Sequence, residues 1–335
     1  MSGATVIIGA GFAGIATAYH LARRNVRDIV VLEREQGPGM HASGRNAGLL
    51  RQSSGDPATA ELLRAGARAA RRIAARIPGA IQTTGSLILG EAVDRLSGGP
   101  RARVVDAGDV VPGLTGRALF DPEDALIDPQ ALLGAYQSAA RRRGVEFSFG
   151  ESVEELDGCQ VTTSARRIDA ERVVVAAGAW ASEVSRTIEI KPFRRHLFRG
   201  TCDGVTADTP FVWHEGDGVY FRPESGGVLM SPCDVEAHPV ADPQYDDNQR
   251  EVLAERIDAT FGALGEWRIG NGWACLRSFA PDNRFVIGAD PHVAGLYWVA
   301  GLGGHGVTAS WAVGRLAARV ILGQQDAGPF DPNRF

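Results

Sequence analysis

Hydrophobic and polar positions near the start of the chain predict a compact strand–helix–strand unit. Residues 4–9 (ATVIIG) form a short apolar run, rich in β-branched residues, which indicates a buried parallel strand. Residues 12–24 carry one apolar face and end in Arg23 and Arg24, a favourable helix terminus. Residues 28–33 (DIVVLE) predict a second buried strand. Together these segments have the size expected of a βαβ unit.

The rest of the chain alternates between the same two kinds of pattern. Asp128 and Pro129 are a favourable N-cap and first helical residue. From 190 to 235 the pattern changes to short strands such as 219–222 and 227–231, separated by turns, which predicts an antiparallel sheet. Elsewhere the patterns predict helices at 58–77, 129–143, 246–262 and 307–322, and strands at 145–149, 172–177, 284–288 and 296–300.

These patterns predict an α/β protein with two interleaved parts. The two ends and the middle of the chain carry the strand–helix patterns of a Rossmann-type dinucleotide-binding domain. Segments of antiparallel β pattern are inserted between them. The predicted division is 1–80, 128–188 and 270–335 for the first domain, and 81–127 and 189–269 for a substrate-binding domain.

Composition argues against a nucleic-acid-binding or membrane-spanning protein. The 335 residues include 35 basic and 40 acidic side chains, for a net charge of −5, so nucleic acid is not an expected partner. No apolar run approaches the roughly 20 residues that span a bilayer, so we expect no transmembrane segment and a cytoplasmic protein. Segment 4–22 lacks a basic leader, and its glycines fit a nucleotide-binding turn, so it belongs to the fold.

Cysteine, histidine and lysine usage narrows the chemistry further. The four cysteines are widely separated and form no CxxC pair, which argues against a disulfide framework or a zinc site. No HxxH, HExxH or acidic cluster suggests a metal, so no metal is expected. Lys191 is the only lysine, so any mechanism that needs a lysine has one candidate.

The turn after the first predicted strand carries the glycine motif of dinucleotide-binding proteins. Gly9 permits the tight turn, Gly11 lets the backbone approach a pyrophosphate, and Gly14 lets helix and strand pack closely. Glu33 ends the second strand and can accept the hydroxyls of the adenosine ribose, which disfavours NADP. The motif residues that face the nucleotide are Gly9, Gly11, Phe12, Ala13 and Gly14.

Three further segments favour a flavin over a nicotinamide. The glycine-rich stretch 37–50 follows the second strand directly and can lay backbone along a larger cofactor. Segment 172–180 is a buried strand that breaks at Gly178. The glycine loop 301–306 opens a helix, whose positive end can stabilise charge on a reduced flavin.

Nearly the whole chain, in order, resembles the D-amino acid oxidase superfamily of FAD-dependent enzymes. The resemblance rests on the segments GAGFAG, VLERE, HASGRNAG, VAAGAW, LRSFAPDNRFVIG and GGHG. It looks strongest for the D-arginine dehydrogenase type of D-amino acid dehydrogenase, with features of glycine and sarcosine oxidases. It implies a glutathione-reductase-like FAD domain, an antiparallel substrate sheet, and oxidation of a C–N bond by hydride transfer to flavin N5. Beyond the glycine motif and Glu33, the resemblance implies cofactor contacts at Arg34, Ala42, Ser43, Gly44, Arg45, Ala47, Gly48, Leu49, Val153, Ala177, Gly178, Trp180, Cys275, Gly303, Gly304, His305, Gly306, Val307 and Thr308.

The resemblance also implies substrate-binding residues. Tyr220 lies at the position of a substrate-contacting tyrosine, and Arg277 at that of a carboxylate-binding arginine. Arg51 matches the carboxylate-binding arginine of sarcosine oxidases, and Cys275 matches their covalent flavin attachment point. The alternatives are a packed strand tyrosine, surface or phosphate-facing arginines, and a small buried thiol with non-covalent FAD.

Departures from the D-arginine dehydrogenase pattern affect the expected substrate. Ser54, Leu49 and Ser86 replace the lid tyrosine, the pocket histidine and the glutamate that would hold a cationic side chain. Without that glutamate, the guanidinium of a bound arginine substrate would be buried with no carboxylate partner. We therefore expect a neutral or acidic amino acid or amine as substrate. Arg51 and Arg277 then suggest two cationic anchors, one for the α-carboxylate and one for a second acid group.

The electron acceptor and two other functions stay open. Thr308 occupies a position where sarcosine oxidases carry a lysine, and Lys191 is a doubtful substitute for their second lysine. This favours a dehydrogenase that passes electrons to a quinone or carrier over an oxidase that uses O2. The alternatives are a 2-hydroxy acid dehydrogenase, or a non-catalytic flavoprotein subunit or assembly factor, given the missing lid tyrosine and the short segment 86–103.

Overall fold

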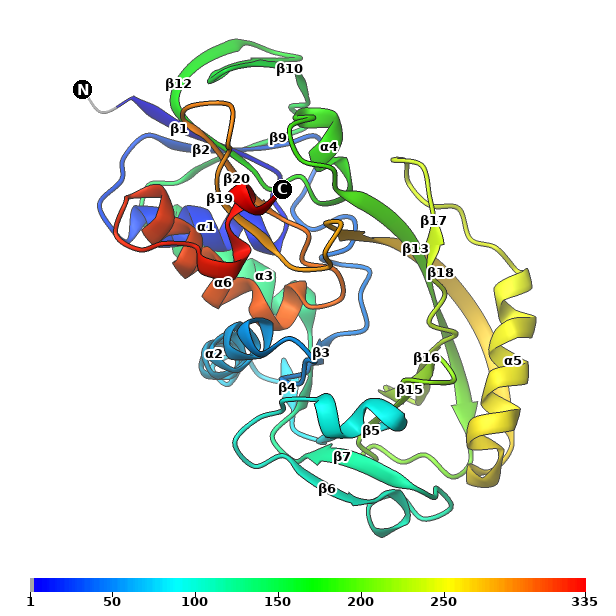
Figure 1. The fold of residues 1–335 in the computed structure, drawn as a ribbon. Coiled ribbons are helices and arrows are strands. Elements are labelled where there is room, and N and C mark those ends of the chain that lie inside the picture. Colours follow the sequence, from blue (N-terminus) through cyan, green and yellow to red (C-terminus); the bar gives the residue numbers. More distant parts are fainter. Residues whose placement is uncertain (1–2) are drawn as a thin grey trace.

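The computed structural model describes residues 3–335 as two interleaved parts, each built on one large β-sheet (Figure 1). Both chain ends lie in the same part, although the chain crosses to the other part and returns. A mainly parallel sheet in one part and a mainly antiparallel sheet in the other confirm the predicted α/β fold class.

The first part is a parallel sheet extended at its margins. The first two strands pair in parallel, as the predicted βαβ unit requires, with Thr5 opposite Ile29. β12 lies on the other side of β1, also in parallel. The strands are β1 (Ala4–Ile8), β2 (Ile29–Glu33), β9 (Glu146–Phe149), β10 (Val153–Asp157), β11 (Gln160–Thr163), β12 (Arg167–Val175), β19 (Val286–Ala289) and β20 (Leu296–Ala300).

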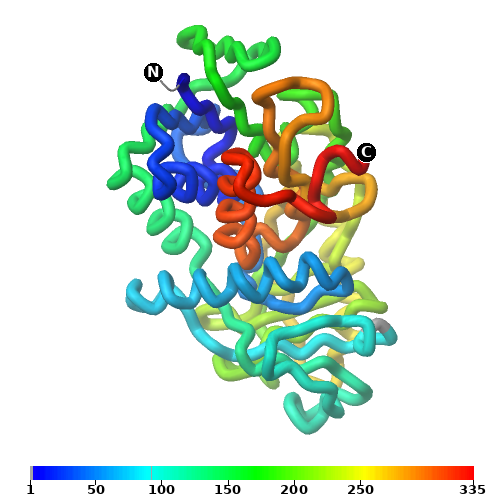
Figure 2. Tube along the Cα trace, turned by 60° about the vertical axis from the view of Figure 1, so that its left-hand side comes forward, coloured from blue at the N-terminus to red at the C-terminus, as the bar shows by residue number. Residues whose placement is uncertain are grey.

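Helices cover this parallel sheet on one face, where the largest hydrophobic core forms. Pro57 and Pro129 begin two of them, and Asp56 and Asp128 cap them through side-chain carboxylates. In Figure 2 the long α2 lies across the molecule between the helices of the first part and the strands of the second. These helices are α1 (Phe12–Ala22), α2 (Pro57–Ala74), α3 (Pro129–Arg141) and α6 (Gly306–Ile321). The short α4 (Ala181–Val184) packs in a separate core on the opposite face.

The second part is a nine-stranded, mainly antiparallel sheet. One pair, β5 with β14, is parallel. Its outer face packs on α5 (Asn248–Phe261), which contributes Leu253, Ile257 and Phe261 to a second core. Its strands are β5 (Ser86–Leu89), β6 (Arg103–Asp106), β7 (Arg117–Asp121), β13 (Lys191–Cys202), β14 (Phe211–His214), β15 (Val219–Glu224), β16 (Gly227–Ser231), β17 (Glu236–Ala237) and β18 (Trp267–Phe279).

Short elements connect the two parts. A three-stranded sheet joins segments from both predicted domains: β3 (Leu49–Leu50), β4 (Ile81–Gln82) and β8 (Ala125–Ile127). Short 3₁₀ helices occur at η1 (Glu91–Arg95), η2 (Ala107–Asp109), η3 (Gly178–Trp180), η4 (Gly262–Leu264), η5 (Gly328–Phe330) and η6 (Pro332–Arg334).

Strand alternation decides which side chains of the second sheet face the first part. Val219 and Phe221 pack into the core beneath α5, whereas Tyr220 between them lies in a separate cluster on the inner face. On β13 and β18, Arg195 stands directly opposite Cys275, and Arg277 is two residues further along. These side chains therefore share the inner face of the sheet.

The structure differs from the predicted elements chiefly in two strands that are longer than expected, β12 and β13, and in β18, where no strand was predicted. β12 begins at Arg167, because its first half pairs with β11. β13 and β18 pair along nearly their whole lengths, from Lys191 opposite Phe279 to Cys202 opposite Trp267. The predicted domain boundary at 269/270 falls within β18, which belongs to the second sheet along its length.

Candidate active site

One elongated cavity runs between the two parts of the molecule, and nearly all the predicted site residues line it. One end, here called the nucleotide end, is formed around Gly9, Gly11, Glu33 and Trp180. The other, here called the sheet end, lies against the inner face of the nine-stranded sheet. Its walls include Arg51, Arg195, Trp213, Tyr220 and Arg277.

The turn at the nucleotide end has no room for larger residues. Gly9 has φ +108°, and an added Cβ would lie 2.5 Å from the carbonyl oxygen of Ala176. A Cβ on Gly14 would lie 2.0 Å from the carbonyl oxygen of Gly9, so Gly14 sets the distance between α1 and the turn. The backbone can therefore approach a pyrophosphate as the motif predicts.

Glu33 is held in place by the same turn. Its two carboxylate oxygens accept hydrogen bonds from the backbone N–H groups of Ala10 (2.9 Å) and Glu35 (3.0 Å). Each oxygen retains a lone pair, so the carboxylate can still accept from ribose hydroxyls. Beside it, the Arg34 guanidinium stacks 3.8 Å from the ring centroid of Trp180, giving a planar wall.

Two helices point their N-termini at the cavity. Among residues 3–335, the N-cap positions Gly11 of α1 and His305 of α6 make no side-chain cap hydrogen bond, and the N–H of Phe12 donates to the hydroxyl of Ser43 at 3.1 Å. Free N–H groups and the helix dipole favour anionic groups at both places. The starts of these two helices and the close-packed turn Gly9–Gly14 fit a dinucleotide cofactor such as FAD.

The glycine loop before α6 joins the two parts at the sheet end. The N–H of Gly303 donates to the carbonyl of Ser278 at 3.0 Å, which fixes the loop beside Arg277 on β18. The hydroxyl of Thr308 accepts from the backbone N–H of Arg51 at 3.1 Å and donates to the carbonyl of Leu49 at 3.2 Å. Thr308 therefore positions the segment that carries Arg51.

Three arginines gather at the sheet end. Arg195 donates to the carbonyl of Asp234 at 2.9 Å and lies 3.8 Å from the Asp234 carboxylate. Arg277 makes one long bond, 3.4 Å, to the same carbonyl, and its buried Nε has no hydrogen-bond partner among residues 3–335. The Arg51 guanidinium lies 4.6 Å from the ring centroid of Trp213.

Burial sets the protonation states at this end. It raises the pKa of Tyr220 to about 12, so the phenol stays protonated. Burial, reinforced by Arg51 and Arg277, lowers the pKa of His305 to about 3, so the imidazole stays neutral. Burial and then Arg195 lower the pKa of Arg277 to about 10, which leaves it charged at neutral pH.

The structure brings most of the predicted site residues together. Arg51, Tyr220, Arg277 and Cys275 all line the cavity. Gly14, Gly44 and Gly48 do not line the cavity. A Cβ on Gly44 would meet the carbonyl of Gly39 at 2.3 Å, and one on Gly48 that of Ile127 at 2.4 Å, so these glycines allow two stretches of backbone to pack closely. The other predicted cofactor residues that line it are Gly9, Gly11, Phe12, Ala13, Glu33, Arg34, Ala42, Ser43, Arg45, Ala47, Leu49, Val153, Ala177, Gly178, Trp180, Gly303, Gly304, His305, Gly306, Val307 and Thr308.

Sequence reasoning missed Arg195, Trp213 and Cys233, which also line the cavity. Arg195 sits in the run Arg194–Arg195–His196, where an irregular pattern gave no sign of which residue faces inward. The register of β13 against β18 supplies that information, because it sets Arg195 opposite Cys275.

The positions that depart from the D-arginine dehydrogenase pattern supply no carboxylate to the sheet end. Ser86 donates to Asp124 at 2.7 Å and lies outside the cavity, and Ser54 bridges to Ser97. Glu33 and Glu151 are the carboxylate residues lining the cavity within residues 3–335. Lys191 is exposed and pairs with Glu189 at 3.3 Å, so the one lysine of the chain lies outside the cavity.

Comparison with known families identifies this arrangement. Residues 4–320 match the family described as "FAD dependent oxidoreductase" (DAO). The chain belongs to this FAD-dependent oxidoreductase family. The oxidoreductase is 25% identical to the glycine oxidase of Bacillus licheniformis over 95% of the chain and 93% of that protein. It is 24% identical to the monomeric sarcosine oxidase of Streptomyces avermitilis, over 98% of the chain and 97% of that protein.

Solved structures show the same fold. The L-proline dehydrogenase of P. horikoshii superposes with a TM-score of 0.87 at 20% identity, covering 100% of this chain and 98% of that chain. Within residues 3–335 of the oxidoreductase, no helix has the length and apolar character needed to cross a membrane. The same residues contain no group of three or more His, Cys, Asp or Glu side chains arranged to hold a metal ion.

Proposed function

We propose that this oxidoreductase oxidises the C–N bond of an amino acid or secondary amine. The observation that carries the proposal is the pair of arginines, Arg51 and Arg277, placed with Tyr220 at the sheet end of the cavity, next to the glycine loop. Arginine binds a carboxylate through two parallel, charge-assisted hydrogen bonds, so this end suits a carboxylate-bearing substrate.

FAD would lie along the cavity from Glu33 to the glycine loop. Gly9, Gly11 and the start of α1 would receive the pyrophosphate, and Glu33 the ribose hydroxyls. The start of α6, from His305 to Thr308, would face the flavin ring. When bound, FAD supplies the hydride acceptor, a chemistry that the side chains themselves lack.

The chain's own residues bind and orient the substrate. Arg277 holds the α-carboxylate, and Tyr220, protonated and 9% exposed, can donate a hydrogen bond to it. His305 stays neutral and adds no charge repulsion to a protonated amine. Leu197, Phe211 and Trp213 close the sheet end with apolar surface, which limits water around the reacting bond.

We further propose that the acceptor of the electrons is a quinone or a carrier and that the protein acts as a dehydrogenase. The support is the position of Lys191, which is exposed and lies outside the cavity, so the cavity has no lysine to assist O2 reduction. Air reoxidation of the reduced protein that is fast and saturates with O2 would reverse this assignment.

Anaerobic mixing with a panel of amino acids, secondary amines and 2-hydroxy acids tests the function. We expect the flavin absorption to bleach with at least one amine that carries a carboxylate. Bleaching by 2-hydroxy acids alone would identify a hydroxy acid dehydrogenase instead. Retention of the oxidised spectrum with every compound would favour a non-catalytic flavoprotein subunit or assembly factor.

Acid precipitation tests whether Cys275 binds FAD covalently. Cys275 lines the cavity, but burial raises the pKa of its thiol to about 11, and a neutral thiol is a poor nucleophile. We therefore expect the yellow colour to remain in the supernatant after precipitation with trichloroacetic acid. A yellow pellet from the native protein and a colourless one from Cys275→Ala would instead establish the covalent bond.

A further inference from the structure

We propose that the sheet end of the cavity is a dianion site, so that the preferred substrate is an amine carrying two carboxylates. Arg277 would bind the carboxylate next to the reacting carbon and Arg51 the second one. The inference rests on the proposed function, because it assigns a substrate class to the same cavity.

Arg51 lies in the cavity without a carboxylate partner. Among residues 3–335, no Asp or Glu oxygen lies within the 4.0 Å of a salt bridge from its guanidinium, which packs instead against Trp213. Its backbone is tied to Thr308, so the side chain begins from a fixed point at the start of α6. Loss of solvent is the main cause that lowers the pKa of Arg51.

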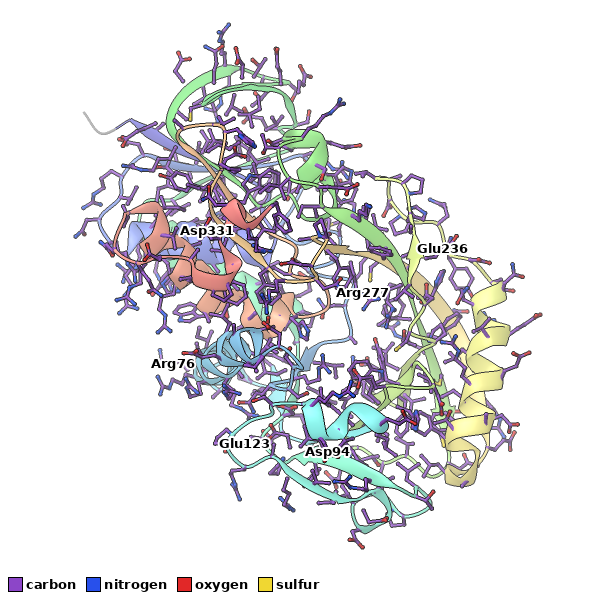
Figure 3. The ribbon with its side chains drawn as sticks, viewed as in Figure 1. Arg76, Asp94, Glu123, Glu236, Arg277 and Asp331 are labelled. Atoms are coloured by element: carbon purple, nitrogen blue, oxygen red, sulfur yellow. The ribbon has the colours of Figure 1, made fainter. Side chains whose placement is uncertain are left out.

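Arg277, on β18, likewise lines the cavity without an ion pair among residues 3–335. Figure 3 shows it between β18 and the loop before α6. A Cβ added to Gly304 would lie 3.8 Å from its Nη1, so its guanidinium reaches over the glycine loop. Its sole hydrogen bond within the described residues is the 3.4 Å contact with the carbonyl of Asp234, and it makes no ion pair there.

Within residues 3–335, the nearby carboxylates form no ion pair with Arg51 or Arg277. Asp234 pairs with His196 at 2.8 Å and also lies beside Arg195. Asp124 and Glu215 attract Arg51 electrostatically, but neither forms an ion pair with it among residues 3–335. Asp124 accepts instead from the N–H of Gln52 and the hydroxyl of Ser86, and burial together with Asp121 raises its pKa. One carboxylate oxygen of Glu215 is buried without a hydrogen-bond partner in the described residues. The described residues therefore leave both guanidinium groups in the cavity without a direct ion pair.

The two arginines approach the same short segment of the cavity wall: Arg277 reaches over Gly304, and the backbone of Arg51 is bonded to Thr308 four residues later. In addition to burial, both lower the pKa of His305 through their positive charge, and Tyr220 and Cys233 line the cavity with them. Unpaired charges in a partly dry cavity are costly, and a ligand with two carboxylates would neutralise both.

Binding of unreactive acids to the FAD-loaded protein tests the site without turnover. Glutarate and butyrate have the same chain shape as iminodiacetate and sarcosine, respectively, with a methylene in place of the amine. We expect glutarate to perturb the flavin spectrum with a Kd at least about 30-fold below that of butyrate, as loss of a buried charge contact implies. Equal affinities would overturn the dianion site.

Variants assign the second carboxylate to Arg51. In Arg51→Gln we expect the glutarate-to-butyrate preference to fall to within about threefold, because the second anchor has lost its charge. Arg268→Gln is the matched control: Arg268 lies on β18 with its side chain 67% exposed and should keep the native preference. An unchanged preference in Arg51→Gln would exclude Arg51 as the anchor and overturn the proposal.

Turnover separates this inference from the proposed function. We expect iminodiacetate or aspartate to reduce the flavin faster than sarcosine or asparagine, their monocarboxylate counterparts. Equal rates for both kinds of amine would leave C–N oxidation standing and overturn the dianion preference. Tight glutarate binding with no reduction by any amine would support the dianion site and contradict C–N oxidation.

Discussion

The Arg277→Gln variant is expected to lower kcat/KM for the best amine substrate by about 30- to 3,000-fold, equivalent to about 2–5 kcal/mol. Arg277 stands in the cavity with a buried, unpartnered Nε, so its charge is available to a carboxylate. Glutamine retains hydrogen-bonding groups but loses the charge and the two-pronged geometry. The measurement is anaerobic reduction of the flavin by substrate, followed over a range of substrate concentrations.

Two further variants serve as controls for this prediction. Arg268→Gln changes an exposed arginine of the same strand and should retain native kinetics. Arg277→Lys keeps the charge but not the fork, so we expect it to recover part of the loss. If Arg277→Gln reacts as fast as the native protein while its thermal unfolding is unchanged, Arg277 does not bind the substrate carboxylate.

Local chemistry explains why the nucleotide end could be predicted from the sequence. The turn at Gly9, the cap at Asp128 and the strand ending at Glu33 each depend on residues near one another in the chain. Backbone conformation, capping and short strands follow directly from such neighbours. For the same reason, the predicted helices begin and end within a few residues of the observed ones.

The sheet end depends on residues far apart in the chain. Arg195 and Cys275 stand opposite each other through the register of β13 with β18, and that register is set by packing along the whole pair. Likewise, the hydroxyl of Thr308 in the first turn of α6 accepts from the backbone N–H of Arg51, a residue 257 positions earlier in the chain. No periodicity in the sequence reports such contacts, so the lack of a direct ion pair for Arg51 and Arg277 among residues 3–335 became visible only in the structure.

The contact between α2 and α6 is another feature that the sequence pattern did not predict. A Cβ on Gly66 would lie 2.0 Å from the carbonyl oxygen of Thr308 and 3.1 Å from the Cα of Ala309. The first turn of α6 therefore rests directly on α2, and its position determines where Thr308 and the glycine loop lie. A glycine in a helix is ordinarily a weakness, whereas here it permits the close approach of two backbones.

The Gly66→Ala variant is consequently expected to unfold more readily and to retain less FAD. Alanine stabilises most helix interiors by about 0.5–1 kcal/mol relative to glycine. At Gly66 that gain is outweighed by overpacking, which costs about 1–3 kcal/mol or more when the obstructing atoms are backbone and cannot rotate away. Gly134→Ala in α3 is the matched control, because a Cβ there meets nothing within 4 Å.

The two alanine variants should therefore shift stability in opposite directions. Urea unfolding of the FAD-loaded protein would show Gly134→Ala at or above the native midpoint and Gly66→Ala below it. The FAD content per chain, read from the absorption spectrum, should fall in Gly66→Ala alone, because displacement of α6 moves the helix terminus proposed to face the flavin. A Gly66→Ala protein as stable as Gly134→Ala and fully loaded with FAD would show that α6 is not held by this contact.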